Sequence, residues 1–205
     1  MISFLAMIGV SFVSYAIGSI PFGLLIGKFN RIDIRQRGSG NIGATNITRT
    51  LGRDWGIACF FLDFCKGLVP VLVARQAVPD WGATPAILAA AAAIAGHIWP
   101  VYLRFKGGKG MATSLGALIA LAPFHVLICA AIWYLVFLLS RYVSLASIIA
   151  ALALPLASFL FRTRVETTVL LAVIAALIIY RHRSNIIRLL EGTENRFERT
   201  HRKKH

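Results

Sequence analysis

Long apolar runs separated by short polar segments extend along most of this chain. Unbroken apolar runs lie at 86–95, 115–122, 148–154 and 169–179. Strands of a membrane barrel would instead show short segments in which apolar and polar residues alternate, so these runs predict helices. Helices that are apolar on every side need lipid or other helices around them rather than water. The pattern therefore predicts an all-α integral membrane protein.

Seven transmembrane helices account for this pattern. We expect them at 1–27, 55–74, 84–103, 111–122, 123–139, 142–161 and 167–180. The stretch 111–139 contains no acid, Lys or Arg. As one helix it would be about 43 Å long, against a hydrocarbon core of about 30 Å. Pro123 lies near its middle and gives the alternative of two short helices.

The distribution of positive charge decides between these alternatives. With a break at Pro123, 18 of the 22 Lys and Arg residues fall on one side of the membrane. The three on the other side are Arg75, Arg162 and Arg164. A single helix would instead separate the eight cations of 181–205 from those of 28–53. Basic residues gather in cytoplasmic loops, so we predict seven spans, with the N-terminus outside and the C-terminus in the cytoplasm.

The composition excludes other classes of protein. Hydrophobic residues make up 58% of the chain, charged residues 15%, and the mean hydropathy is +0.73. Soluble domains are about half apolar and about a quarter charged, so a soluble or disordered protein is excluded. The net charge of +14 suits anionic lipid or an anionic substrate. Nucleic acid is not expected, because no polar module carries the charge. We expect one domain over 1–205 that ends in a flexible basic tail at 196–205.

Three polar segments fall on the predicted cytoplasmic side, at 38–52, 96–113 and 181–194. The first is rich in glycine and in small amide and hydroxyl residues, a composition that brings backbone N–H groups close to a ligand. Asn46 and Arg49 are three residues apart and would share one face of a helical turn. An ordinary connecting loop is the alternative interpretation of this segment.

The second segment contains a glycine turn with two cations, Lys106 and Lys109, directly before a predicted helix. Such a turn binds phosphate through its N–H groups, the helix dipole and the lysine charge. It is not a nucleotide P-loop, because Gly110 stands where that motif requires Ser or Thr. The alternative is a basic cytoplasmic loop in which glycines only break the helices.

In the third segment His182, Asn185 and Arg188 recur every three residues and form one polar stripe on a helix. A basic helix that lies on lipid headgroups is the alternative. Asp63 and Lys66 are also three residues apart, but inside a predicted span, where they can pair with each other. Charges inside a membrane are expensive and are usually functional, so this pair either holds helices together or takes part in chemistry.

The three segments together predict a cationic, glycine-lined pocket at the cytoplasmic membrane surface. Ser144 and Ser147, three residues apart in a predicted span, are expected to line the same cavity. Cations suit one or two phosphate groups, and apolar surroundings suit an acyl chain. The expected chemistry is therefore phospholipid synthesis.

The motifs within these three segments are specific to one family. They are 39–46 with Arg49, then Gly96-His97 with 105–110 and 112–113, then Arg181-His182 with 185–186, 188–189 and 192–194. They closely resemble, in order and over nearly the whole chain, the bacterial acyl-phosphate-dependent glycerol-3-phosphate acyltransferase family.

The resemblance implies a multi-pass enzyme of the bacterial inner membrane, with a cytoplasmic active site. It implies transfer of a fatty acyl group from acyl phosphate to the 1-hydroxyl of sn-glycerol 3-phosphate, which gives lysophosphatidic acid and inorganic phosphate. This is the first acylation of bacterial phospholipid synthesis. No metal, CoA or other cofactor is implied, and we expect a monomer in contact with membrane lipid.

The resemblance also implies the site residues, at the positions that match the family's motifs. Catalysis is expected from Ser39, Arg49, Lys109, His182 and Asn185. Further contacts to substrate and phosphate are expected from Asn41, Thr45, Asn46, His97, Lys106, Gly107, Gly108, Gly110, Thr113, Ser147, Arg188 and Glu194.

The proton acceptor is open at this stage. No histidine is followed by Asp five residues later, the dyad of many soluble acyltransferases. His182 or His97 can act as the base, although a lone histidine at a span end is more typical of packing. We favour the leaving phosphate as acceptor, because an acyl phosphate is a reactive mixed anhydride. The alternative functions are a membrane transporter for an organic phosphate and a lipid-binding scaffold.

Overall fold

The computed structural model describes residues 2–197, so most of the predicted basic tail, 198–205, lies outside the described residues. In the described part the chain forms α-helices and short 3-10 turns, without strands. The helices are α1 (Ile2–Gly18), α2 (Phe22–Phe29), α3 (Ala44–Leu51), α4 (Arg53–Ala77), α5 (Thr84–Ile98), α6 (Met111–Leu121), α7 (Pro123–Ser140), α8 (Val143–Leu160), α9 (Val165–Arg181) and α10 (Arg183–Leu190). The 3-10 turns are η1 (Ile34–Gln36), η2 (Pro79–Trp81) and η3 (Val101–Leu103). The prediction of an all-α protein is confirmed.

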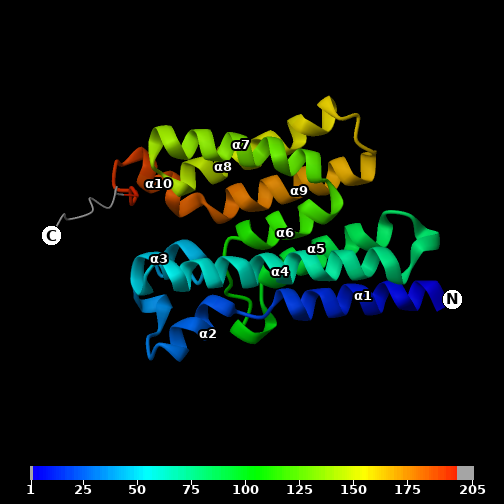
Figure 1. Cartoon of the computed structure of the whole chain (residues 1–205), viewed down its shortest axis with the longest axis horizontal. Helices are drawn as coiled ribbons and strands as arrows, with labels where there is room; N and C mark the ends of the chain where they lie inside the picture. Colours follow the sequence, from blue (N-terminus) through cyan, green and yellow to red (C-terminus); the bar gives the residue numbers. More distant parts are fainter. Residues whose placement is uncertain (1, 198–205) are drawn as a thin grey trace.

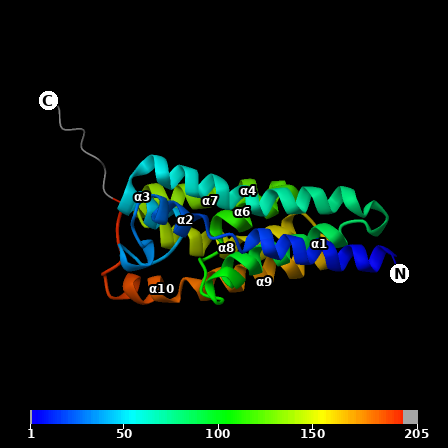
Figure 2. The same cartoon turned by 90° about the horizontal axis from the view of Figure 1, so that it is seen from below.

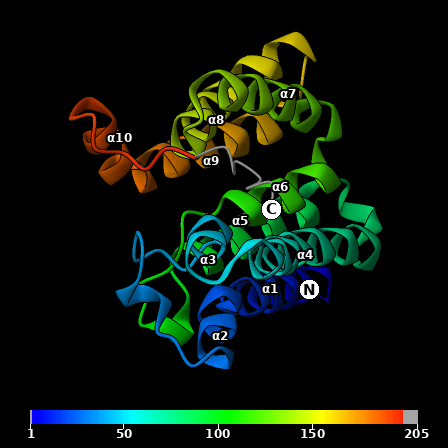
Figure 3. The same cartoon turned by 60° about the vertical axis from the view of Figure 1, so that its left-hand side comes forward.

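The helices form two groups that lie side by side (Figures 1 and 3). The first group contains α1 to α6, with α1 packed on α5 and α4 packed on α6. The second contains α7 to α10, with α8 packed between α7 and α9. Contacts of α5 with α9 and of α6 with α7 join the two groups, and the long helices run nearly parallel (Figure 2).

Small residues allow the closest helix contacts in the first group. A side chain at Gly67 of α4 would collide with the backbone carbonyl of Thr113, and one at Gly116 of α6 with that of Phe64. A side chain at Gly18 of α1 would likewise collide with the backbone of α5. Membrane helices pack through such small residues because lipid supplies no hydrophobic drive for helix association.

Five helical segments are long and apolar enough to cross a membrane, and six if α9 and α10, bent by 55°, count as one span. The predicted break before Pro123 is confirmed, because α6 ends at Leu121 and α7 begins at Pro123. At 11 residues, α6 falls short of a full span. The structure therefore supports a multi-pass helical membrane architecture.

The prediction of one unbroken helix over 1–27 is wrong. The chain leaves the helix after Gly18 and enters α2 at Phe22. Pro21 has no N–H to donate and disfavours a helical conformation at Ile20. The carbonyl of Ile20, which lies in this break, accepts a hydrogen bond from Lys66 Nζ at 2.7 Å, so a polar partner on α4 stabilises the break. The two helices still form one candidate span, Phe4–Phe29.

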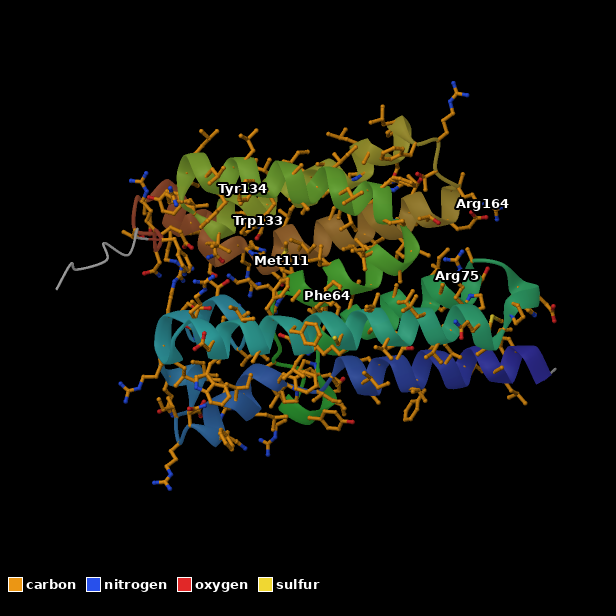
Figure 4. All side chains as sticks on the ribbon, viewed as in Figure 1. Phe64, Arg75, Met111, Trp133, Tyr134 and Arg164 are labelled. Atoms are coloured by element: carbon orange, nitrogen blue, oxygen red, sulfur yellow. The ribbon has the colours of Figure 1, made fainter. Side chains whose placement is uncertain are left out.

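The two ends of the bundle differ in chemistry. Arg75 and Arg164, two of the three cations expected on the opposite side from the polar segments, lie at the end of the bundle far from α3 and α10 (Figure 4). The start of α1 lies at that end as well (Figure 1). The polar residues of 38–52 and 181–194 lie at the other end, which places the candidate chemistry there.

The two charges inside α4 pair with each other, as their spacing predicted. Asp63 Oδ1 lies 2.7 Å from Lys66 Nζ, and both side chains are almost completely buried. His97 Nδ1 lies 3.7 Å from the same carboxylate oxygen and 3.0 Å from the hydroxyl of Thr113. This polar cluster therefore connects α4 with α5, α6 and the break after α1.

Removing one member of the buried pair should destabilise the protein more than removing the charge of both. Lys66→Met leaves Asp63 buried without its counter-ion, and we expect a loss of about 3 kcal/mol or more in the free energy of unfolding. Thermal unfolding in detergent measures the change. The double variant Asp63→Asn/Lys66→Met should recover part of the loss. A double variant less stable than Lys66→Met would contradict the pairing argument.

Candidate active site

A cavity of about 580 Å³ lies between the two helix groups. Met111 at the start of α6 and Trp133 of α7 both line it and come from opposite groups (Figure 4). Its polar side chains are Ser39, Asn41, Thr45, Thr48, Asn46, Arg49, Arg53, Asp63, His97, Lys109, Ser114, Ser144, Ser147, His182, Asn185 and Glu194. An apolar part of the wall is formed by Leu115, Leu118, Val126, Cys129, Ala130, Ala150, Ala151, Leu154 and Ile178. The cavity thus joins a cationic, amide-rich region to an apolar one.

Asn46 shapes the loop before α3. Its side chain is 1% exposed, its Nδ2 donates to the carbonyls of Ile34, Arg37 and Asn41, and its Oδ1 accepts from the N–H of Ser39 at 2.9 Å. The amide group of Asn46 therefore makes its hydrogen bonds within the protein. They hold Ser39 and Asn41 at the cavity, and Arg49 follows one turn later on α3, as its spacing predicted.

The glycine turn is built differently from the phosphate cradle that its sequence predicted. The N–H of Gly107 donates to the carbonyl of Ile98 at 3.2 Å, and the N–H of Gly108 donates to that of His97 at 3.1 Å. These two amides are therefore not free for a ligand. Glycine is needed here for another reason, because a side chain at either position would collide with His97 or its carbonyl.

Arg181 holds the glycine turn from the other side. Its guanidinium donates to the carbonyls of Gly107 at 2.8 Å and Gly108 at 3.1 Å. The turn then leads into α6, whose first residues line the cavity. The first N–H groups of a helix have no intrahelical partner and attract anions. The part of this segment that suits an anion is therefore the start of α6 together with Lys109, rather than the two amides before it.

Some predicted site residues do not reach the cavity wall. Lys106 is exposed away from it, and Thr113 is fully buried against His97. Arg188 acts through another residue, because its Nε donates to Glu194 Oε2 at 2.8 Å. The other predicted residues of the three segments, except Gly107 and Gly108, line the cavity.

Glu194 joins the third polar segment to α8. Its Oε1 accepts hydrogen bonds from Ser144 Oγ at 2.9 Å and from Asn185 Nδ2 at 2.8 Å, and Arg188 binds its other oxygen. Burial alone would raise the pKa of this carboxyl group, but the hydrogen bonds from Asn185, Ser144 and Arg188 outweigh burial and lower it. Glu194 is therefore a buried, ionised acceptor for three donors.

Lys109 meets this network through Asn185, whose Oδ1 accepts a hydrogen bond from the lysine ammonium. Burial, reinforced by repulsion from Arg188, Arg49 and Arg181, lowers the pKa of Lys109 to about 8, although Glu194 acts against the shift. The protein's own groups thus compensate its positive charge only in part. An anionic ligand would compensate it further, which favours anion binding here.

His182 offers an acceptor nitrogen to the cavity. Its Nδ1 lies 2.8 Å from the carbonyl of Ile178, and a carbonyl only accepts, so Nδ1 carries the proton. Neutral imidazole then keeps a lone pair on Nε2. The ring is 3% exposed and lies at the cavity wall, at the junction of α9 and α10.

The sequence motifs missed four aromatic residues of the wall, Phe60, Trp133, Phe137 and Phe197. Trp133 Nε1 donates to Ser147 Oγ at 3.2 Å, which places Ser147 at the cavity as predicted, together with Ser144. Trp133 and Phe137 lie within an apolar run where nothing distinguishes a cavity-lining aromatic from a lipid-facing one. No sequence signal separates them from their neighbours.

Fold and site together define an integral membrane protein in which a cationic, amide-rich region continues into an apolar cavity. A family model described as glycerol-3-phosphate acyltransferase matches residues 8–192. The chain belongs to this family, as its motifs indicated.

Named relatives and solved structures agree with this assignment. The glycerol-3-phosphate acyltransferase of Aquifex aeolicus is 47% identical over 186 residues, which cover 90% of this chain and 95% of that protein. That of Geobacter sulfurreducens is 50% identical over 192 residues, with 91% and 95% coverage. The crystal structure of PlsY (YgiH), an integral membrane glycerol 3-phosphate acyltransferase, in its glycerol 3-phosphate form is 44% identical, with a TM-score of 0.89 and coverage of 94% and 96%. Its lysophosphatidic acid form gives a TM-score of 0.86.

The stability contributed by Glu194 should depend on pH. Its folded-state pKa lies below the ordinary value of 4.5, so ionised Glu194 stabilises the fold fully above pH 4.5, and this contribution is lost as the pH falls through the folded pKa. Glu194→Gln should cost about 2 kcal/mol at neutral pH. The difference in Tm from the wild type, measured in detergent, should shrink below pH 4.5. A difference that stays constant from pH 7 to pH 3.5 would exclude the ionised acceptor.

Proposed function

We propose that this protein transfers a fatty acyl group from acyl phosphate to the 1-hydroxyl of sn-glycerol 3-phosphate, with lysophosphatidic acid and inorganic phosphate as products. The observation that carries the proposal is the continuity of the cavity, because one wall holds Arg49, Lys109, His182 and Asn185 and another is apolar. Both substrates carry phosphate, and one carries a long hydrocarbon chain. A single cavity with a cationic region and an apolar region suits this pair of substrates.

Glycerol 3-phosphate binds at the cationic region in this proposal. Arg49 and Lys109 contact its phosphate, and the N–H groups at the start of α6 are available to the second phosphate, that of the donor. The glycerol hydroxyls are left for polar groups at the cavity wall. Ser39, His182 and Asn185 offer donors and acceptors for them.

The acyl donor places its hydrocarbon chain along the apolar wall formed by Leu118, Val126, Ala150 and Leu154. The 1-hydroxyl oxygen of glycerol 3-phosphate forms a bond to the acyl carbonyl carbon, and the bond from that carbon to the phosphate oxygen breaks. The leaving phosphate takes the hydroxyl proton. Cations beside the phosphate stabilise the charge that develops on it. Acyl phosphate suits this route because its phosphate is both a good leaving group and a base.

The proposal includes the membrane arrangement. We place the protein in the bacterial inner membrane as a monomer of one domain, with seven spans, an outside N-terminus and a cytoplasmic active site. The position of the polar segments at one end of the bundle, with Arg75 and Arg164 at the other, supports this orientation. The short helix α6 is the seventh span, and its five buried residues lie against the other helices rather than lipid.

A two-substrate assay tests the reaction. Purified protein is incubated with palmitoyl phosphate and glycerol 3-phosphate, and inorganic phosphate and lysophosphatidic acid are measured. We expect phosphate and lysophosphatidic acid to form only when both substrates are present, and no lysophosphatidic acid when palmitoyl-CoA replaces palmitoyl phosphate. Flux of glycerol 3-phosphate across vesicles without acylation would support a transporter instead. Binding of both substrates with neither flux nor product would support a scaffold.

The proton acceptor is tested at His182. If the leaving phosphate accepts the proton, His182→Ala should keep kcat within about threefold of the wild type, while KM for glycerol 3-phosphate rises about tenfold through one lost hydrogen bond. Steady-state kinetics with palmitoyl phosphate held at saturation separates the two parameters. If kcat instead falls by about two orders of magnitude or more while KM stays unchanged, His182 is the base.

A further inference from the structure

The chain turns back after α10 and crosses the polar end of the molecule as an extended segment, which we call the strap (residues 194–197). Thr193 and Glu194 donate their N–H groups to the carbonyl of Arg188, which fixes the turn. Figure 2 shows the strap running from α10 toward α3. It lies outside residues 8–192 that match the family model, and Glu194 and Phe197 line the cavity.

One side of the strap is fixed to the second helix group. Arg196 Nε donates to the carbonyl of Ser140 at 3.2 Å, and the N–H of Phe197 donates to that of Arg141 at 2.9 Å. The ring of Phe197 packs edge-on against Phe137, with ring centres 5.9 Å apart. Together with Glu194, these contacts hold the strap on α7, α8 and α10.

The other side of the strap contacts Arg49, which belongs to the first helix group. Arg49 Nη2 donates to the carbonyl of Asn195 at 3.2 Å. Its guanidinium carbon lies 5.7 Å from the centre of the Phe197 ring, within the range of a cation–π interaction. The strap thereby reaches across the cavity from one helix group to the other.

Arg49 needs such contacts to stay at the cavity. It lies on the eight-residue helix α3, it is exposed, and its long side chain has many rotamers to choose from. Arg188 and Lys109 lie near it and repel it, while Glu194 attracts it more strongly than Arg188 repels it. A carbonyl oxygen and an aromatic face both attract a cation without neutralising it, so they hold the guanidinium while leaving its charge available to an anion.

We propose that the strap positions Arg49 for the phosphate of glycerol 3-phosphate, and that Phe197 and the carbonyl of Asn195 are the groups that do so. The inference rests on the proposed function for the identity of the ligand. Phe197 acts through Arg49 and does not take part in the transfer itself. The strap therefore sets the affinity for the acceptor substrate and leaves the chemical step unchanged.

Kinetics of Phe197 variants of the full chain test this role. Phe197→Ala should raise KM for glycerol 3-phosphate about fivefold, with kcat within twofold and KM for palmitoyl phosphate unchanged. Phe197→Tyr keeps the aromatic face and should restore the wild-type KM. Phe159→Ala removes an exposed phenylalanine, 81% accessible, at the other end of α8, and should change neither KM. A rise in KM for palmitoyl phosphate instead, or no rescue by Tyr, would overturn the proposal.

A double-mutant cycle with Arg49→Lys separates positioning of Arg49 from a general loss of structure. The stabilisation by glycerol 3-phosphate, measured as a shift in Tm in detergent, serves as readout for all four proteins. The loss caused by Phe197→Ala should be largely absent in the Arg49→Lys background. Equal losses in both backgrounds would overturn the proposal.

This readout also keeps the two proposals apart, because it does not require turnover. Suppose that the wild-type protein binds glycerol 3-phosphate, that Phe197→Ala loses this binding, and that no phosphate is released from palmitoyl phosphate. This result would contradict the proposed reaction and support the proposed role of the strap. If instead the wild-type protein acylates glycerol 3-phosphate and Phe197→Ala has an unchanged KM for it, the result would support the reaction and contradict the proposed role of the strap.

Discussion

The organisation of the site depends on holding several like charges close together at the membrane without cancelling them. Lys109 and Arg49 line the cavity, Arg181 and Arg188 lie close enough to act on Lys109, and Glu194 is a carboxylate bound by Arg188 among them. Neutral oxygen atoms hold most of these cations, since Arg181 binds two glycine carbonyls, Arg49 binds a strap carbonyl and Lys109 binds an amide oxygen. Dipoles stabilise a cation without supplying an opposite charge, so an anionic ligand still gains from entering.

Deep in the first helix group a cation is held differently, by a counter-ion as well as a dipole. Lys66 is matched by Asp63, and its ammonium also donates to the carbonyl of Ile20 at the break between α1 and α2. His97 connects this cluster to the glycine turn, whose amides donate to the carbonyls of His97 and Ile98. A series of side-chain and backbone contacts thus connects the glycine turn before Lys109 to the break between α1 and α2.

Sequence reasoning recovered the features that depend on period and spacing. The apolar runs gave the helices, Pro123 gave the break between α6 and α7, and the three-residue spacings gave the face shared by Asn46 and Arg49. It failed where a partner distant in sequence decides the outcome. The amides of Gly107 and Gly108 look free in the sequence, because only the folded loop shows that the carbonyls of α5 consume them. Phe197 escaped notice for a similar reason, since its role comes from Arg49, which lies on another helix group.

The position of Glu194 after α10, the last helix that the structure describes, affects how the protein is made. Domains fold from the N-terminus as synthesis proceeds, and Glu194 leaves the ribosome after all the helices that carry its donors, Ser144, Asn185 and Arg188. Until then the nascent chain presents its cations to the lipid surface without the acceptor that organises them. The finished site therefore forms only after Glu194 has left the ribosome, so a product truncated before this residue would insert in the membrane without an assembled centre.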